Sequence, residues 1–297
     1  PSGSAKGGAM KAIYKRGLAS YFQTMMGPVF IAVLTAATGV YFAIYNLMSG
    51  YPYFAMTLQS TMFILMITVP VLTMKSFAEE RRNKSDQCIL TAPVSIGEIV
   101  TGKYFAMVTV FAVPMAMFCI CPVLIDMVGE GNYAMDFSAI GSFFLIGCAY
   151  ISVGMFISSL TESQIIAAAG TFAVLLVFHL WDTILGLLPS SPVVNLCGMI
   201  VLVLALAGIY YLLARDVGAA LLLAGIGSCL LVMGYLLKPN YFRSGLSYYL
   251  GGISFYGSFK DMVANRILRM EAWASYVSVA AIFCFLTDRR LEKRRWS

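Results

Sequence analysis

The chain is poor in charge and in the residues that build enzyme centres. Only 11% of its 297 residues are charged and 60% are hydrophobic, whereas a globular domain is about a quarter charged. It has one histidine, and its seven cysteines include no C-x-x-C pair, which argues against a zinc site and a disulfide framework. The composition also excludes a disordered protein. A net charge of +6 suits the inner face of a membrane protein, so we expect no nucleic-acid partner.

Long apolar segments dominate the sequence instead. A hydrocarbon core about 30 Å thick needs roughly 20 helical residues, and apolar residues here fill both faces of each segment rather than alternating, which predicts helices and not barrel strands. The predicted fold class is an all-α polytopic membrane protein with about eight transmembrane helices in a lipid bilayer. The expected spans are 28–48, 54–74, 104–126, 138–160, 165–188, 193–214, 217–237 and 272–288.

The basic residues predict the orientation of these spans. Lys and Arg cluster before the first span, between the second and third, and after the last, and such clusters mark the cytoplasmic side. We therefore expect a multi-pass protein of the plasma (inner) membrane with both termini cytoplasmic. The outer segment 238–271 also carries basic residues, but the two termini together outweigh it.

The segments outside the spans have distinct patterns. Residues 1–9 precede Met10 and are interpreted as a cloning remnant. Residues 10–27 place apolar side chains at helical spacing with basic residues off that stripe, which predicts an amphipathic helix in the inner interface, acting as a topology anchor or in gating. In 238–271, Phe259 and Met262 share an apolar face, which predicts a helix that lies flat at the outer interface or dips into it. Residues 28–297 form one transmembrane domain.

Residues 75–103 form the longest predicted cytoplasmic loop. Both signs of charge are mixed within two helical turns, in Glu79, Glu80, Arg81, Arg82 and Asp86. A solvated loop would explain this pattern. Since the chain has no other sizeable cytoplasmic surface, we favour a docking surface for a partner.

One motif in this loop imitates a nucleotide site. Residues 97–103, GEIVTGK, fit G-x-x-x-x-G-K, but Tyr104 stands where a P-loop needs Ser or Thr for magnesium, and no buried strand precedes the motif. We therefore reject nucleotide binding here, and we expect no catalytic residue and no metal in this chain.

Ionisable residues inside spans are costly and commonly functional. His179 and Asp182 lie one turn apart in the fifth expected span. Their position near its outer end favours interfacial hydration, and a role in lining a substrate pathway is the alternative.

Three motifs together resemble a known family. These are the stretch from Thr73 to Phe105, TMKSFAEERRNKSDQCILTAPVSIGEIVTGKYF, the N-terminal KRGLASYFQTMMGP, and the closing FCFLTDRRLEKRRW. They resemble ATP-binding-cassette type-2 permeases of the gliding-motility and copper-enzyme-maturation-like branch. Gly17 departs from the glutamate usual there, and the hairpin 193–237 adds two spans to the branch's common six.

The resemblance implies a non-catalytic permease subunit without an ATPase of its own. Its partners would be a second permease copy or paralogue and two ATPase subunits, which would bind ATP and magnesium, while this chain would carry no cofactor. Glu79, Glu80, Arg81, Arg82 and Asp86 would form the cytoplasmic coupling helix that seats in the ATPase. We expect an export-type transporter. The alternatives are an ATP-driven mechanical or regulatory platform that acts on an envelope partner, and a secondary transporter, for which central carboxylate pairs are missing.

Overall fold

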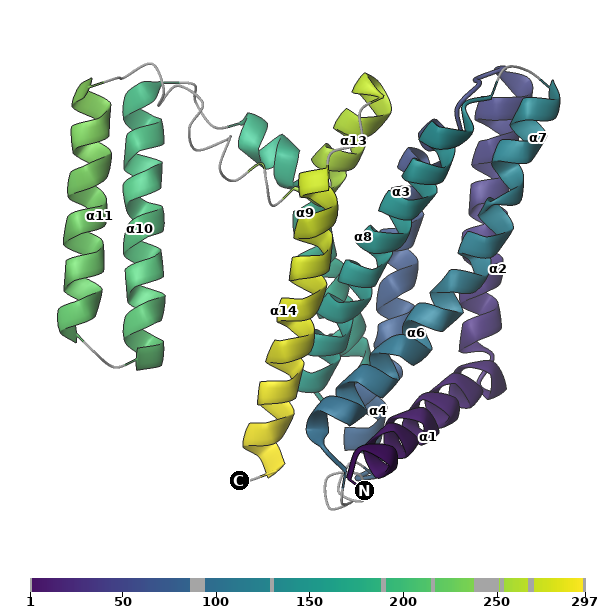
Figure 1. Cartoon of the computed structure of the whole chain (residues 1–297), viewed down its shortest axis with the longest axis horizontal. Helices are drawn as coiled ribbons and strands as arrows, with labels where there is room; N and C mark the ends of the chain where they lie inside the picture. Colours follow the sequence, from purple (N-terminus) through teal and green to yellow (C-terminus); the bar gives the residue numbers. More distant parts are fainter. Residues whose placement is uncertain are drawn as a thin grey trace. The chain divides into compact units, whose positions relative to one another are not determined.

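The computed structural model describes residues 2–85, 94–128, 131–187, 191–214, 217–237, 251, 254–266 and 270–295. Every regular element in these ranges is a helix (Figure 1), which confirms the predicted fold class. The elements are α1 (Ser2–Gln23), α2 (Met26–Phe42) with a π-helical end η1 (Ala43–Met48), α3 (Phe54–Thr73), α4 (Lys75–Arg82), α6 (Ile96–Phe118), α7 (Ile120–Val128), α8 (Tyr133–Leu160), α9 (Gln164–Gly186), α10 (Pro192–Ala214), α11 (Val217–Leu237), α13 (Phe255–Asn265) and α14 (Met270–Arg295).

Contacts divide the chain into two units. The first contains residues 1–179 and 255–297, and the second contains residues 180–254. Within the second unit, α10 and α11 pack against each other as a helical hairpin. These helices have 23 and 21 residues, but only the shorter apolar stretches Pro192–Val201 and Ala224–Leu237 stand out among their described residues. That the hairpin crosses the membrane stays a prediction.

Among the residues that the structure describes, six helices are long and apolar enough to cross a bilayer. They run over Met26–Met48, Phe54–Arg82, Ile96–Met127, Tyr133–Leu160, Gln164–Gly186 and Met270–Arg295. They match the first five expected spans and the last one. The third begins eight residues before the expected start, because Ser95 and Glu98 form a capping box at the N-terminus of α6.

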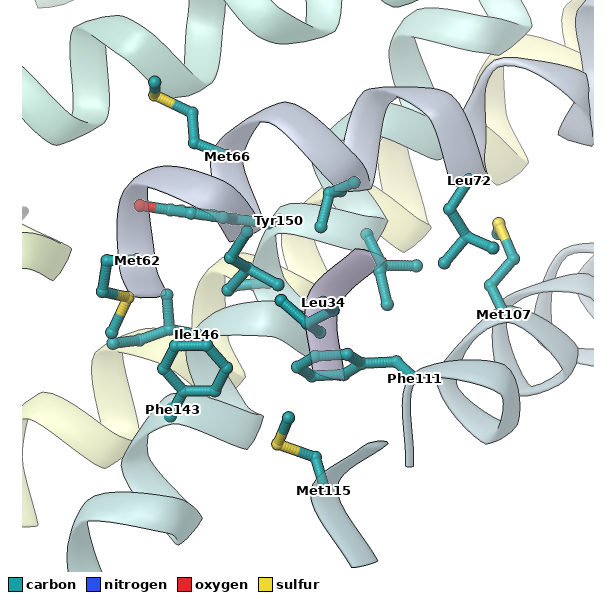
Figure 2. Packing of buried hydrophobic residues seen from close by; sticks show 14 of the residues in the cluster. Leu34, Met62, Met66, Leu72, Met107, Phe111, Met115, Phe143, Ile146 and Tyr150 are labelled. Carbon is teal, nitrogen blue, oxygen red and sulfur yellow. The ribbon is translucent and has the colours of Figure 1, made fainter. Parts of the chain in front are cut away.

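Helix α8 is the centre of the first unit. In the most apolar 18-residue stretch of α8, 72% is buried, compared with 11% in that of α14. Helix α8 packs against α3, α4, α6, α13 and α14. Figure 2 shows Phe143, Ile146 and Tyr150 of α8 among side chains from the neighbouring helices. Gly154 lets α3 approach closely, since a Cβ built there would lie 2.8 Å from Thr73 Cβ.

Polar contacts join α3 to its neighbours at the end opposite α4. Asp136, near the start of α8, accepts a hydrogen bond from the backbone N–H of Phe54 at 2.9 Å, and this caps α3. Asn46 donates to the carbonyls of Tyr51 and Tyr53 and accepts from Thr57. These bonds fix the short connection between η1 and α3.

The predicted outer helix exists as α13, but its apolar face does not lie free for lipid. Phe255, Phe259 and Met262 are buried, and α13 packs on α3 and α8. Arg266 follows it and stacks over the Tyr53 ring at 4.3 Å. Helix α13 is therefore a cap on one end of the bundle.

Both termini of the first unit lie at the other end, near α4 (Figure 1). Arg295 at the end of α14 donates to the carbonyl of Val94 at 3.4 Å. Helix α1 packs along α6; it begins before residue 10 and ends at Gln23, short of the expected residue 27. Termini at one end agree with an even number of crossings.

Candidate functional site

Helix α4 continues the transmembrane helix α3 beyond the bilayer. The run Phe54–Arg82 has 29 residues, which corresponds to about 44 Å, compared with a hydrocarbon core of about 30 Å. A turn at Asn83 to Ser85 ends it, with Lys84 in the left-handed region at φ 55°. The predicted coupling helix is thus a helix over Lys75–Arg82. Asp86 lies outside the described residues.

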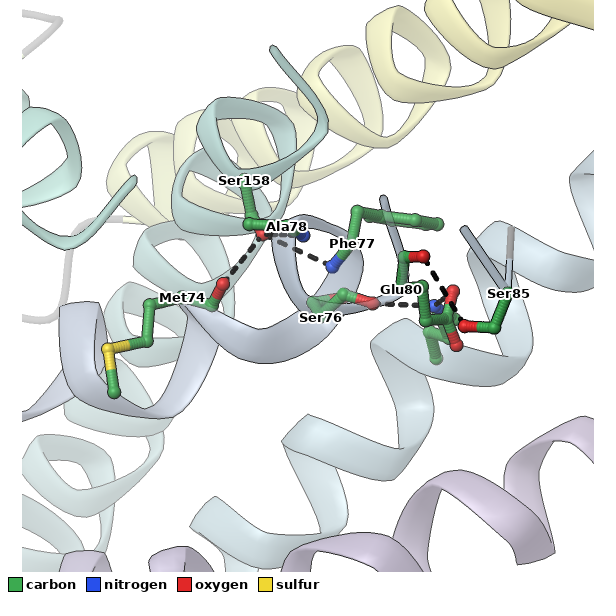
Figure 3. Close-up of polar contacts among 8 residues, drawn as sticks. Met74, Ser76, Phe77, Ala78, Glu80, Ser85 and Ser158 are labelled. Carbon is green, nitrogen blue, oxygen red and sulfur yellow. Dashed lines mark hydrogen bonds and ion pairs between the residues drawn. The ribbon is translucent and has the colours of Figure 1, made fainter. Parts of the chain in front are cut away.

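Ser158 of α8 attaches α4 to the bundle (Figure 3). Its Oγ accepts hydrogen bonds from the backbone N–H groups of Phe77 and Ala78, each at 3.1 Å, and donates to the carbonyl of Met74 at 3.1 Å. One buried hydroxyl therefore satisfies three backbone groups where α3 passes into α4.

Lys103 of α6 makes a second attachment. Its ammonium pairs with the Glu80 carboxylate, donates to the carbonyl of Ser76, and lies 4.1 Å from the centroid of the Phe77 ring. Only 11% of the Lys103 side chain and 24% of the Glu80 side chain are exposed. A pair this deeply set orders α4 more than a surface pair would.

The residues that fit the phosphate-loop pattern belong to a helix and serve helix packing. Residues 97–103 form the first turns of α6, and a P-loop requires a loop whose backbone N–H groups face the phosphates. A Cβ at Gly102 would lie 3.1 Å from Ile13 Cγ2 and 3.2 Å from the carbonyl oxygen of Met10. Gly102 serves close contact between α1 and α6.

The structure assigns most of the predicted coupling residues to contacts within the chain. Glu80 pairs with Lys103, and Arg81 donates to the carbonyl of Ser159 at 2.8 Å and pairs with Glu162 at 3.3 Å. The Glu79 Oε2 atom lies 3.6 Å from the Lys75 Nζ atom. Arg82 is exposed, as are its neighbours Asn83 and Lys84. Whether any of these residues contacts an ATPase stays a prediction.

Gly17 also has a packing role. A Cβ there would lie 3.2 Å from Ala106 Cβ. A side chain at this position would require Ala106 on α6 to move away by a few tenths of an ångström. Glycine at 17 thus goes with a close contact between α1 and α6, not with an ion pair to the loop.

A cavity of about 230 Å³ lies between α1, α4 and the start of α6. Tyr21 lies in its wall and is buried, and burial followed by the nearby carboxylates of Glu80 and Glu79 raises the pKa of its phenol. Sequence reasoning missed this cavity and Ser158, because each depends on residues brought together from distant helices. The cavity is lined by Ile13, Arg16, Gly17, Ser20, Tyr21, Thr24, Lys75, Ser76, Glu79, Glu80, Asn83, Ser85, Ile99, Lys103 and Ala106.

His179 and Asp182 lie in the second half of α9 (Gln164–Gly186). The His179 ring stacks on Tyr256 with centroids 4.3 Å apart and meets Phe63 at 6.2 Å. Its Nδ1 is buried without a hydrogen-bond partner among the described residues, and the same holds for Oδ2 of Asp182. His179 falls in the first unit and Asp182 in the second. The pathway role of this pair stays a prediction.

A comparison with known families decides the class of the protein. A family model described as "ABC-2 family transporter protein" matches residues 11–191. The chain belongs to the ABC-2 transporter family. The matched segment includes α4, α6 and the part of α1 from residue 11 onward, and it ends one residue before α10 begins. No curated protein matches the chain.

Membership of this family confirms the prediction, made from the sequence motifs, that the protein is a type-2 permease. ABC-2 permeases are transmembrane subunits without an ATPase of their own, and they generally work with ATPase partners in a lipid bilayer. The protein is thus a multi-pass membrane component of an ABC transporter.

Proposed function

We propose that this ABC-2 permease is of the export type and is driven by two separate ATPase subunits that dock on α4. The observation that carries the proposal is the attachment of α4: it extends α3 out of the bilayer, and Ser158 and Lys103 hold it to α8 and α6. A docked partner that moves α4 would therefore move the transmembrane helices with it.

ATP would act through a difference in contacts. A partner can shift the permease between conformations only if it binds α4 more tightly in one of them, and closure of the ATPase pair on ATP and magnesium would provide that difference. The functional unit would contain a second permease copy or paralogue. The motifs around Ala78 to Glu80 and at residues 89–95 support the proposal that the chain belongs to the gliding-motility and copper-enzyme-maturation-like branch.

The exposed tip of α4 gives the test of docking. Arg82→Glu reverses a charge in the proposed contact, and a like-charge contact in an interface costs several kcal/mol. We expect the ATPase that co-purifies with the wild-type permease from its native membranes, identified by mass spectrometry, to decrease at least tenfold. The matched control is Lys260→Glu, the same reversal on the exposed side of α13.

Two results bear on this proposal directly. Undiminished co-purification of the ATPase with Arg82→Glu, together with normal ATP-dependent activity, would contradict docking at the tip of α4. A complex that hydrolyses ATP in response to the permease and moves no solute would favour the mechanical or regulatory platform over export.

The proposed orientation places α4 and both termini in the cytoplasm of an inner membrane, and α13 outside. Single cysteines replacing Lys293 near the end of α14 and Lys260 in α13, both exposed, should react with an impermeant maleimide from opposite faces once the native thiols are removed. In intact cells we expect Lys260→Cys to label and Lys293→Cys to label only after permeabilisation. The reverse order would invert the orientation, and labelling of both from outside would contradict the even number of crossings.

A further inference from the structure

The cavity between α1, α4 and α6 has the features of a ligand site. Its volume of about 230 Å³ exceeds the ~150 Å³ of an engineered protein cavity that admits benzene. It therefore accommodates a small polar group of about eight non-hydrogen atoms. Eleven of its fifteen lining residues have polar side chains, among them Ser20, Thr24 and Asn83.

One wall residue lacks a hydrogen-bond partner. The side-chain hydroxyl of Ser76 is buried, and none of the described residues bonds to it, although Ser76 is only 7% exposed. A buried hydroxyl without a partner costs about 1–3 kcal/mol, and native proteins rarely leave one unexplained. Since Ser76 lines the cavity, a bound polar group is the partner it can reach.

The charges around the cavity have both signs. Glu80 and Lys103 neutralise each other within the wall. Lys75 and Glu79 are only loosely paired, at 3.6 Å, with 20% and 37% of their side chains exposed. Arg16 is exposed and pairs with no carboxylate in the part of the chain that the structure describes. The cavity thus offers two cations and one carboxylate to a ligand.

We propose that this cavity binds the zwitterionic phosphoethanolamine headgroup of a membrane phospholipid. Arg16 and Lys75 bind the phosphodiester, the Ser76 hydroxyl donates a hydrogen bond to it, and Glu79 accepts from the ammonium group. Charge-assisted bonds of this kind are the strong ones, and each charge of the headgroup meets its opposite. A purely anionic headgroup would leave Glu79 without a cation to bind.

The position of the cavity suits a lipid better than a soluble phosphate compound. It lies at one end of a bundle of membrane-spanning helices, beside α1, where an interface with headgroups is expected. Exposed apolar side chains adjoin the lining residues along the chain: Phe22 follows Tyr21 and is 44% exposed, and Met25 follows Thr24 and is 74% exposed. Acyl chains have apolar surface to cover there.

Native mass spectrometry of the purified full chain tests the proposal. The chain is titrated with phosphatidylethanolamine, with phosphatidylglycerol and diacylglycerol of the same acyl chains, and with soluble phosphoethanolamine. We expect one tight site for phosphatidylethanolamine and at least tenfold weaker binding of the other three. Arg16→Gln should weaken that binding about tenfold, and Lys15→Gln, which removes the neighbouring exposed cation of α1 outside the cavity, should change it less than twofold.

Each contrary result is decisive. Equal binding of diacylglycerol or phosphatidylglycerol, or equal losses in Lys15→Gln and Arg16→Gln, would overturn the site. Equal binding of soluble phosphoethanolamine would show a site for a soluble ligand and overturn the lipid assignment. Lys75→Gln gives the same test if Arg16→Gln does not fold. The isolated chain is used, so the outcome does not depend on whether an ATPase docks.

Discussion

Gly154→Ala is expected to destabilise the permease by about 3 kcal/mol, near the upper end of the range for overpacked cores. A methyl group on Gly154 would lie within 2.8 Å of Thr73 Cβ and within 2.9 Å of its Cγ2. Thr73 is fully buried and cannot swing away, because it belongs to α3 where that helix crosses α8. Helices α3 and α8 would have to separate. The measurement is the melting temperature of the purified protein in detergent, with the folded fraction from size-exclusion chromatography.

Two variants control this prediction. Gly39→Ala adds the same methyl group on α2, where a Cβ would meet nothing within 4 Å, and it should be neutral or slightly stabilising because alanine favours helix. Adding Thr73→Ala to Gly154→Ala removes the nearest side-chain atoms and should restore part of the loss, as expected for a coupled pair. Wild-type stability of Gly154→Ala would mean that α3 and α8 do not approach each other as described.

Lys103→Glu is expected to cost 3 kcal/mol or more, roughly the loss on breaking a buried ion pair. It removes the partner of Glu80, places a second carboxylate beside it, and deletes the cation over the Phe77 ring. The effect should appear as a lower melting temperature and as protease cleavage near residues 82–84, since α4 loses its attachment to α6.

The exchanged pair distinguishes an ion pair from mere packing at this site. Lys103→Glu combined with Glu80→Lys restores opposite charges and should recover at least half of the lost stability. If the double variant is no more stable than Lys103→Glu alone, the two side chains do not act as a pair. Glu98→Gln, at an exposed capping carboxylate, is the control for charge alone and should cost at most about 1 kcal/mol.

Hydrophobicity and charge placement were enough to predict the all-α membrane fold and six of its spans. Length and composition decide whether a helix can cross a bilayer, and both can be read locally. Local patterns also predicted the apolar face of α13, whereas the helix at Glu79 to Arg82 was implied only by the family resemblance. They could not show that this face packs on α3 and α8, because an amphipathic segment has the same pattern against lipid and against protein.

The coupling region shows the other limit of sequence reasoning. A run of mixed charges at Glu79 to Arg82 looks like a surface for a partner, yet Glu80 and Arg81 have their opposite charges on α6 and after α8, more than 20 residues away in the chain. Ser158 gives no local signal either, since a serine near the end of a helix is common. The sequence indicated that residues 75–103 are an unusual charged segment. Which of its residues contact the rest of the chain, and which are exposed, could be seen only in the folded structure.

Helix α3 is joined to α8 at both of its ends, by Asp136 to Phe54 at one and by Ser158 to the start of α4 at the other. Two parallel helices that are hydrogen-bonded at both ends cannot slide or tilt against each other without breaking the bonds at one end. In a transport cycle, α3, α4 and α8 would therefore move together as one rigid body. The relative displacements that open a passage must then occur between this rigid body and helices with fewer buried side chains, such as α9 and α14.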